Sequence, residues 1–356
     1  MPAEPPSGRP RLKDVARLAG VSAGTVSHTL NHPDRVTGET RELVLEAIRQ
    51  LGFVPNAHAR ALKSGANQVI GLVVLDIASP FFMQVARAVE RCAREMGHVV
   101  ILSSSDDDSE RESALLRILA AQRVRGCLLT PAGAAPSPAW FSRNRLPVVL
   151  LDHPGGSQDC SVAVDHVAGA RLAVRHLLEL GHRRVAFVGG PVGLRQMADR
   201  AQGARHAIID AGQDPVRVLV EVMEPAFGIA DGIDAAEQLL AGGLPSAVFC
   251  GNDMLAFGVY RRLRQEGLRV PEDVALVGYD DVDFAADWVV PLTSVRQPTD
   301  QLGYLAAQLL FEHVSGHPDH RHQQVMLHPE LVVRRSSGSH IPHTDGGLHH
   351  PGAGRG

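Results

Sequence analysis

After a proline-rich start, the chain enters short stretches in which apolar residues recur at helical spacing. The spacing predicts a helix over residues 12–19 that ends at Gly20, because glycine readily adopts the positive φ of a helix C-terminus. Ser22 is a suitable N-cap for a second helix over residues 23–30. Two helices joined by a tight turn that contains glycine are typical of a helix-turn-helix unit.

A third helix is predicted between Thr37, a second N-cap candidate, and Gly52. Its apolar positions fall at i, i+3, i+4 and i+7 and are Val44, Ala47, Ile48 and Leu51. Within the unit, Ala16 is small enough to let the second helix approach, and Val26 fills the gap between the helices. The outer side of the second helix would face the major groove of a duplex, and its residues are Ser22, Ala23, Gly24, Ser27 and His28.

From residue 69 the pattern changes to apolar runs that alternate with helical stretches. Strands are predicted at 69–75, 99–103, 126–130, 147–151, 185–188 and 274–277, and helices at 82–96, 109–122, 172–180 and 263–266. Such alternation predicts parallel sheets with helices on both faces. Because it continues for about 270 residues, we expect two lobes rather than one sheet.

Charge is distributed unevenly along the chain, which carries −4 in total. Residues 1–65 hold nine Lys/Arg and six Asp/Glu, a net charge of +3, whereas the rest holds 26 and 33, a net charge of −7. A basic head on an acidic body suits a small DNA-binding module attached to a domain that does not touch DNA. With neither a secretory signal nor an apolar run of about 18 residues, we expect a cytoplasmic protein that does not enter the membrane.

Several kinds of chemistry lack their sequence signatures. The chain contains no G-x-G-x-x-G or G-x-x-x-x-G-K-[ST] motif, and its G-x-S-x-G run at residues 20–24 joins two predicted helices rather than a strand and a helix, so it is not a nucleophile elbow. We therefore predict no enzymatic activity, no catalytic residues and no cofactor. The four cysteines lie far apart without a C-x-x-C pair, which indicates reduced core residues. Histidines gather near residues 313–322 and in the last 17 residues, but a loop and a disordered end explain them without a metal.

A long ungapped motif occupies the head. It reads Leu12-Lys13-Asp14-Val15-Ala16-x-x-Ala19-Gly20-Val21-Ser22-x-x-Thr25-Val26-Ser27-x-x-Leu30-Asn31, followed by Leu51-Gly52-Phe53-x-Pro55-Asn56. The body adds Ser79-Pro80-Phe81-Phe82, Gly251-Asn252-Asp253 and Val277-Gly278-Tyr279-Asp280-Asp281. These segments resemble the lactose/galactose repressor (LacI/GalR) family, over roughly residues 11–336.

The resemblance implies a homodimer, in which each head docks its second helix on one half of a near-palindromic operator. It implies DNA contacts by Ser22, Ala23, Gly24, Thr25, Ser27, His28 and Asn31, and by Asn56, Ala59, Leu62 and Lys63. Residues 57–63 would form a hinge helix only on operator DNA, with Leu62 wedged into the minor groove. His28 stands where many members carry arginine, so base discrimination there should be weaker.

The implied domain plan has five segments. They are a disordered tail (1–10), an all-α helix-turn-helix head (11–56), a hinge helix and linker (57–68), a two-lobed effector-binding and dimerisation domain like the periplasmic binding proteins (69–336), and a second disordered tail (337–356). The last segment lacks heptads, so we expect a dimer rather than a tetramer.

The resemblance also places a small-molecule effector in the cleft between the lobes. The candidate effector-binding residues are Phe81, Phe82, Asp152, Asp165, Arg195, Phe227, Asn252 and Asp280. Phe82 could equally be core packing between the lobes, whereas a buried Asp280 would need donors such as sugar hydroxyls or a purine N–H. Leu194 takes the place of an arginine expected in purine-binding members, which favours a carbohydrate.

The sequence therefore predicts a DNA-binding transcriptional regulator associated with the nucleoid. A repressor released by an inducer is favoured, since an effector acts through its different affinities for two states. A nucleobase-responsive corepressor mode and a dual activator and repressor stay open as alternatives. The alternative outside the regulators is a soluble ligand-binding protein, which the DNA-binding head disfavours.

Overall fold

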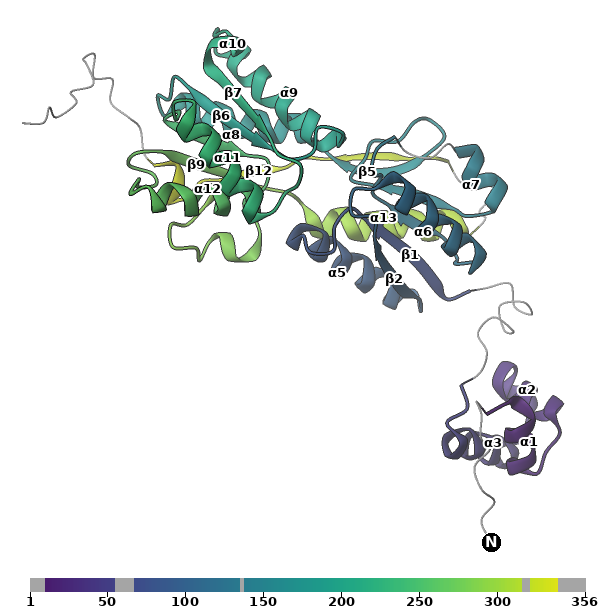
Figure 1. The fold of residues 1–356 in the computed structure, drawn as a ribbon. Coiled ribbons are helices and arrows are strands. Elements are labelled where there is room, and N and C mark those ends of the chain that lie inside the picture. The colour runs from purple at the N-terminus through teal and green to yellow at the C-terminus, as the bar shows by residue number, and fades with distance from the viewer. Residues whose placement is uncertain (1–9, 55–66, 135–137, 316–320, 339–356) are drawn as a thin grey trace, which may run out of the picture. The chain divides into compact units, whose positions relative to one another are not determined.

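The computed structural model describes residues 10–54, 67–134, 138–315 and 321–338 (Figure 1). They fall into two compact units divided between Asn67 and Gln68, which we treat separately. The first unit is the head and the second is the body. The predicted hinge helix lies outside the described residues, as do nearly all of both predicted tails.

The head consists of α1 (Leu12–Ala19), α2 (Ala23–Asn31), a 3-10 turn η1 (Pro33–Arg35) and α3 (Gly38–Leu51). The predicted caps are confirmed for the first two helices: Gly20 follows α1 at φ 68°, and the Ser22 hydroxyl accepts the Thr25 N–H at 3.0 Å. Val26 is fully buried with Val15 and Val44, so it fills the gap as predicted. This core fixes α2 with one side turned to solvent.

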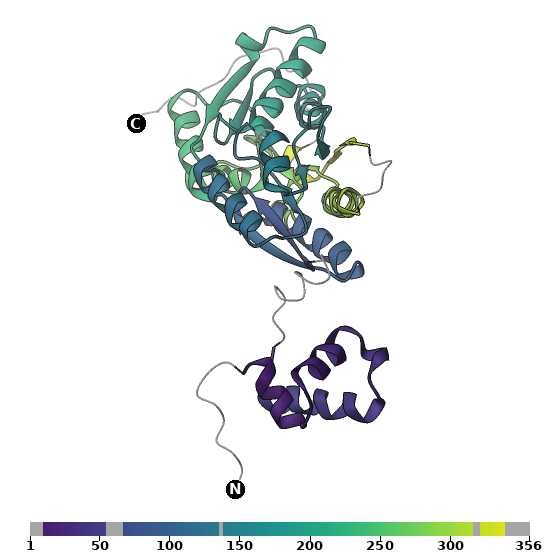
Figure 2. The same cartoon turned by 90° about the vertical axis from the view of Figure 1, so that its right-hand side faces the viewer.

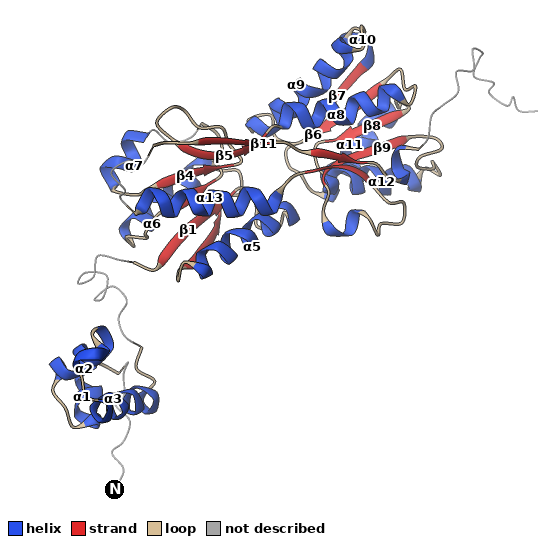
Figure 3. Cartoon of the chain, turned by 180° about the vertical axis from the view of Figure 1, so that it is seen from behind, coloured by secondary structure: helices blue, strands red, loops and turns tan. Residues whose placement is uncertain are grey.

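The body contains two sheets of six strands, seen as separate groups of strands in Figure 3. The first has the order β11-β5-β4-β3-β1-β2 and is parallel throughout. Its strands are β1 (Val69–Val74), β2 (Val99–Ser104), β3 (Cys127–Leu129), β4 (Val148–Leu151), β5 (Cys160–Val164) and β11 (Gln324–Leu327). Four helices pack with it, α5 (Pro80–Glu95), α6 (Ser109–Ala121), α7 (Pro138–Asn144) and α13 (Thr299–Val314). We call this part the N-terminal lobe.

The second sheet has the order β12-β10-β9-β8-β6-β7, with only β12 antiparallel to its neighbour. Its strands are β6 (Val185–Gly189), β7 (Leu219–Met223), β8 (Ala247–Cys250), β9 (Ala275–Asp280), β10 (Thr293–Arg296) and β12 (Glu330–Val332). Its helices are α8 (His166–Glu179), α9 (Arg195–Asp210), α10 (Pro215–Val218), α11 (Ile229–Ala241) and α12 (Asp253–Gln265), with 3-10 turns η2 (Asp283–Ala285) and η3 (Arg335–Ser337). We call this part the C-terminal lobe, and the predicted two-lobed parallel α/β body is confirmed.

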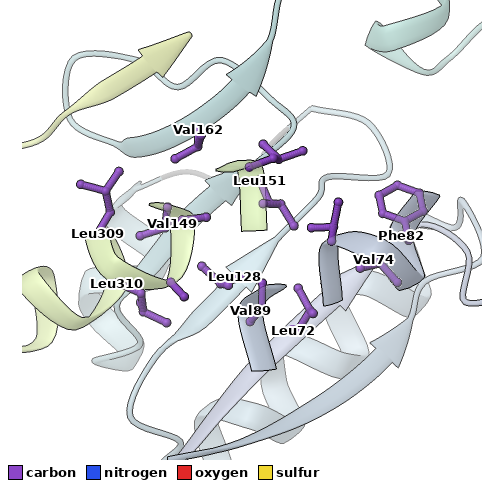
Figure 4. Packing of buried hydrophobic residues seen from close by; sticks show 14 of the residues in the cluster. Leu72, Val74, Phe82, Val89, Leu128, Val149, Leu151, Val162, Leu309 and Leu310 are labelled. Carbon is purple, nitrogen blue, oxygen red and sulfur yellow. The ribbon is translucent and has the colours of Figure 1, made fainter. Parts of the chain in front are cut away.

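The chain crosses between the lobes three times, after β5, after β10 and after β11. Consequently α13 and β11, late in the sequence, complete the N-terminal lobe beside α5 and β5 (Figures 1 and 2). The inner strands of each sheet are buried on both faces, which explains their continuous apolar runs. In the N-terminal lobe, Leu72 and Val74 pack towards α5 and α13 (Figure 4), whereas Val73 packs towards α6.

Candidate functional site

A cavity of about 60 Å³ lies between the lobes. Its lining residues follow the carboxyl ends of β1, β4, β6, β7, β8 and β9, or begin the next helix. This is where open α/β sheets bind ligands. We call it the interlobe cavity, and it is lined by Leu75, Asp76, Ser79, Phe81, Phe82, Asp152, Leu194, Gln196, Met197, Arg200, Phe227, Asn252 and Asp280.

The N-terminal lobe contributes an aromatic wall. Phe81 and Phe82, in the first turn of α5, lie edge to face with ring centroids 5.0 Å apart. Both are at least nine-tenths buried and belong to the core of the lobe as well as to the cavity lining. Phe82 is therefore part of the core, as one interpretation predicts, and its contact with an effector stays a prediction.

The C-terminal lobe contributes a buried cation. Arg200 is 5% exposed on α9, and its guanidinium carbon lies 3.8 Å from the centroid of the Tyr279 ring. One terminal nitrogen donates to the Gly251 carbonyl. The Nε and the other terminal nitrogen lie 3.4 and 3.3 Å from Nδ1 of His166. Arg200 is thus held on several sides before any ligand enters.

His166 connects this cation to a carboxylate of the other lobe. Its Nε2 lies 3.0 Å from Oδ1 of Asp152, which directly follows β4. Its Nδ1 lies 3.1 Å from the Tyr279 hydroxyl. Gln196 adds a second link, because its amide nitrogen donates to the Asp152 carbonyl at 3.1 Å.

Asp280 ends β9 and faces the cavity. Its Oδ1 accepts from the Gln297 amide at 2.7 Å. Burial raises the pKa of Asp280 to about 7, against the lowering effect of nearby Arg200. Asp253 is also buried, and burial raises its pKa, but its oxygens are used by the Ser294 hydroxyl at 2.6 Å and the Val282 N–H at 2.9 Å. Asp253 therefore supports the loops, and Asp280 is the one available from the cavity.

The cavity gathers six of the eight predicted effector-binding residues: Phe81, Phe82, Asp152, Phe227, Asn252 and Asp280. The other two do not line it. Asp165 caps α8 by accepting the Ala168 N–H at 2.9 Å, and Arg195 is an exposed residue 3.4 Å from Asp199.

Sequence reasoning missed Arg200, Gln196 and Met197, which α9 turns towards the cavity. A signal was present in the apolar spacing of α9, because Ala201, Ala204 and Ile208 mark a buried side that includes position 200 and not 195.

In the head, α2 presents the predicted DNA-contact residues. Ala23, Gly24, His28 and Asn31 are exposed, whereas Thr25 and Ser27 are half-buried. Ser22 is exposed but its hydroxyl also lies 2.9 Å from the Thr25 hydroxyl, so both side chains are partly engaged in capping. Asn56, Ala59, Leu62 and Lys63 lie outside the described residues.

A helix-turn-helix head joined to a two-lobed body with a cavity between its lobes defines a ligand-controlled DNA-binding regulator. Residues 11–56 match the family model described as bacterial regulatory proteins, lacI family, and residues 174–337 match the periplasmic binding protein-like domain. The chain is 36% identical over 333 residues to the ribose operon repressor of Escherichia coli K12, covering 92% of this chain and 99% of the relative. It is 34% identical over 335 residues to the HTH-type transcriptional repressor PurR of Pasteurella multocida, covering 93% and 99%.

Among solved structures, the lac repressor dimer bound to operator and the anti-inducer ONPF is similar at a TM-score of 0.78 and 27% identity, covering 93% of this chain and 100% of that one. The chain belongs to the LacI family. It is a DNA-binding transcriptional regulator and not an enzyme, and it acts in the cytoplasm, where such regulators meet DNA. Among the described helices, none has the length and apolarity needed to cross a membrane.

Proposed function

We propose that this regulator represses transcription as a nucleoid-associated homodimer on a near-palindromic operator, and that an uncharged monosaccharide in the interlobe cavity releases it. The observation that carries the proposal is the charge of the cavity lining. Three carboxylates face one cation there, namely Asp76, Asp152 and Asp280 against Arg200.

This balance disfavours an anionic ligand. Arg200 is the only lysine or arginine among the described lining residues, and three of its five N–H donors already meet Gly251 and His166. A phosphate or carboxylate would meet the carboxyl groups of Asp76, Asp152 and Asp280 with only Arg200 to balance them. Sugar hydroxyls can instead donate to the carboxylates and accept from Arg200. A volume of about 60 Å³ holds roughly four waters, which favours a monosaccharide over a larger sugar.

A nucleobase corepressor is the second candidate. The aromatic side chains of Phe82 and Phe227 could stack on a flat ring, and a relative is a PurR repressor. Leu194, however, gives the cavity a buried apolar side chain where a base would need a polar partner. The ribose operon repressor, a relative of similar identity, supports a sugar.

Dimerisation is supported by the edge of the N-terminal lobe. β2 is the outer strand of its sheet, and Val99, Ile101 and Leu102 on it are exposed. Ile118 on α6 is exposed as well. Apolar side chains on an uncovered edge strand favour association, and the similar lac repressor structure is a dimer on operator.

The experiment has a ligand arm and a DNA arm. Thermal unfolding of the full-length protein is measured with D-ribose, D-ribose 5-phosphate and hypoxanthine, because a ligand at 100 times its Kd adds about 2.7 kcal/mol. We expect stabilisation by D-ribose or another free monosaccharide and none by the phosphate. Stabilisation by hypoxanthine alone would favour the corepressor.

In the DNA arm, gel shifts on fragments of the source genome should show specific binding that weakens steeply with salt, since phosphate contacts release counterions. The stabilising sugar should release the fragment. Leu62→Ala, at the predicted wedge, should weaken operator binding and leave sugar binding unchanged. No specific fragment at any salt or ligand concentration would remove the proposal.

A further inference from the structure

His166 lies behind the interlobe cavity rather than in its lining. It is the first residue of α8, directly after the crossover from β5, and is 4% exposed. The groups on either side of it, Asp152 and Arg200, both line the cavity and belong to different lobes. A side chain in this place can act on the ligand only through those two residues.

The contacts define the protonation of the ring. A guanidinium has only donors, so the Nδ1 atom that faces Arg200 must be an acceptor. The proton of a neutral imidazole then sits on Nε2, from which it is donated to the Asp152 carboxylate at 3.0 Å. The ring is therefore a directional bridge that accepts from the cation on one side and donates to the anion on the other.

Tyr279 keeps the bridge in place. Its hydroxyl lies 3.1 Å from the same Nδ1, and its ring lies under the Arg200 guanidinium. This position requires the glycine at 169 on α8, since a Cβ there would lie 2.3 Å from the Tyr279 hydroxyl oxygen. Arg200 and Tyr279 are both buried, so neither can exchange His166 for water.

We propose that His166 is a positioning residue that orients Arg200 for the ligand and joins it to Asp152 across the lobes. This role of His166 rests on the proposed function in one respect, namely that the interlobe cavity is the effector site. A ligand that touches both Asp152 and Arg200 then reinforces a link between the lobes that His166 already makes. The ring thus contributes both to affinity and to the transfer of the signal from cavity to DNA.

Two substitutions separate these contributions. His166→Asn retains an oxygen near the position of Nδ1 that accepts from Arg200 but does not reach Asp152. His166→Gln reaches Asp152 with its amide N–H but leaves Arg200 without its acceptor. The control is His176→Gln, on the same helix, where the ring lies 2.9 Å from the Ser337 hydroxyl and outside the cavity lining.

The full-length variants are titrated with D-ribose, and operator release by D-ribose is measured in parallel. We expect His166→Gln to lose about tenfold in D-ribose affinity, since a hydrogen bond to a charged group is lost. His166→Asn should retain binding but release operator poorly, and the control should match the wild type. The proposal would be overturned if His166→Asn and His166→Gln both behaved like the wild type. It would also be overturned if both variants lost D-ribose affinity and operator release to the same extent.

A second measurement needs no ligand. In protein labelled with ¹⁵N-histidine, the ring shifts of His166, assigned by their loss in the variants, should report a proton on Nε2 and none on Nδ1. A protonated Nδ1 would overturn the proposal even if D-ribose binds. Failure of D-ribose to bind the wild type would count against the proposed ligand and leave this measurement to decide on His166.

Discussion

The two lobes share one strand order but present different edges. β2 in the N-terminal lobe and β7 in the C-terminal lobe occupy the same outer place beside the first strand of each sheet. At the third position of these strands stand Ile101, opposite Gly71, and Glu221, opposite Phe187. Ile101 is 44% exposed, whereas Glu221 makes a bidentate ion pair with Arg205 of α9 at 2.6 and 2.7 Å.

The difference between β2 and β7 shows that strand order alone does not determine which edge of the body can associate with a second chain. Charged side chains on an edge strand discourage pairing with another chain, and exposed apolar ones invite it. In the cavity both lobes supply carboxylates, but the paired aromatic wall of Phe81 and Phe82 comes from the N-terminal lobe and the cation Arg200 from the C-terminal lobe. The same topology thus carries an apolar outer edge in one lobe and a charged outer edge in the other.

The largest expected effect comes from removing the buried cation of the C-terminal lobe. Arg200→Met leaves Asp152 and Asp280 without their compensating charge, so we expect a loss of about 3–5 kcal/mol in the free energy of unfolding. The chain has two tryptophans, Trp140 in the N-terminal lobe and Trp288 in the C-terminal lobe. Urea unfolding followed by fluorescence, with Trp140→Phe to isolate Trp288, locates the loss.

The matched control is Arg205→Met, on the same helix in an exposed pair, which should cost less than about 1 kcal/mol. Similar losses for both variants would show that the buried charges of the C-terminal lobe are not special.

Local sequence was sufficient where the signal was local. Gly20 and Ser22 end and begin helices as predicted, and the alternation of strands and helices gave the body its class. The predicted stretches 172–180 and 263–266 are only the C-terminal parts of α8 and α12. α8 begins earlier because Asp165, assigned from resemblance to the effector, is its N-cap.

Tertiary context decided the rest. The apolar run of β2 reads like that of β1, yet β2 is an exposed edge and β1 is central. Whether Arg195 or Arg200 reaches the cavity depends on which side of α9 meets the other lobe. Resemblance to a family does not establish this orientation. β11 and β12 are each three or four residues long and join different sheets, so their pairing depends on the crossovers.

The next effect tests the edges directly. Ile101→Glu gives β2 the residue that β7 carries at the same position. If β2 is the dimer surface, loss of a central apolar contact should weaken dimerisation by about 2 kcal/mol or more, roughly thirtyfold. Sedimentation equilibrium of the full-length protein measures it, and a dimer as stable as the wild type would exclude β2 from the interface.

The next comparison uses the pH dependence of stability to distinguish the polar wall of the cavity from its apolar wall. Asp280 has a pKa of about 7 in the folded protein against roughly 3.9 when unfolded, so between these values the folded state binds more protons. Stability should therefore fall as pH rises from 4 to 7. Asp280→Asn does not titrate and should flatten this slope by up to about 1.4 kcal/mol per pH unit. Phe82→Leu, on the apolar wall, should leave the slope unchanged, and an equal slope in all three proteins would contradict the assignment.

The smallest effect concerns the charged edge of the C-terminal lobe. Glu221→Gln removes the partner of Arg205 but keeps the strand polar, so we expect a change below about 1 kcal/mol that disappears in 1 M salt. Sedimentation should show no change in oligomeric state, because a polar edge still offers no apolar surface to a second chain. If Glu221→Gln altered association as much as Ile101→Glu, the C-terminal edge would be part of the interface, and the contrast between the lobes would lie only in the cavity.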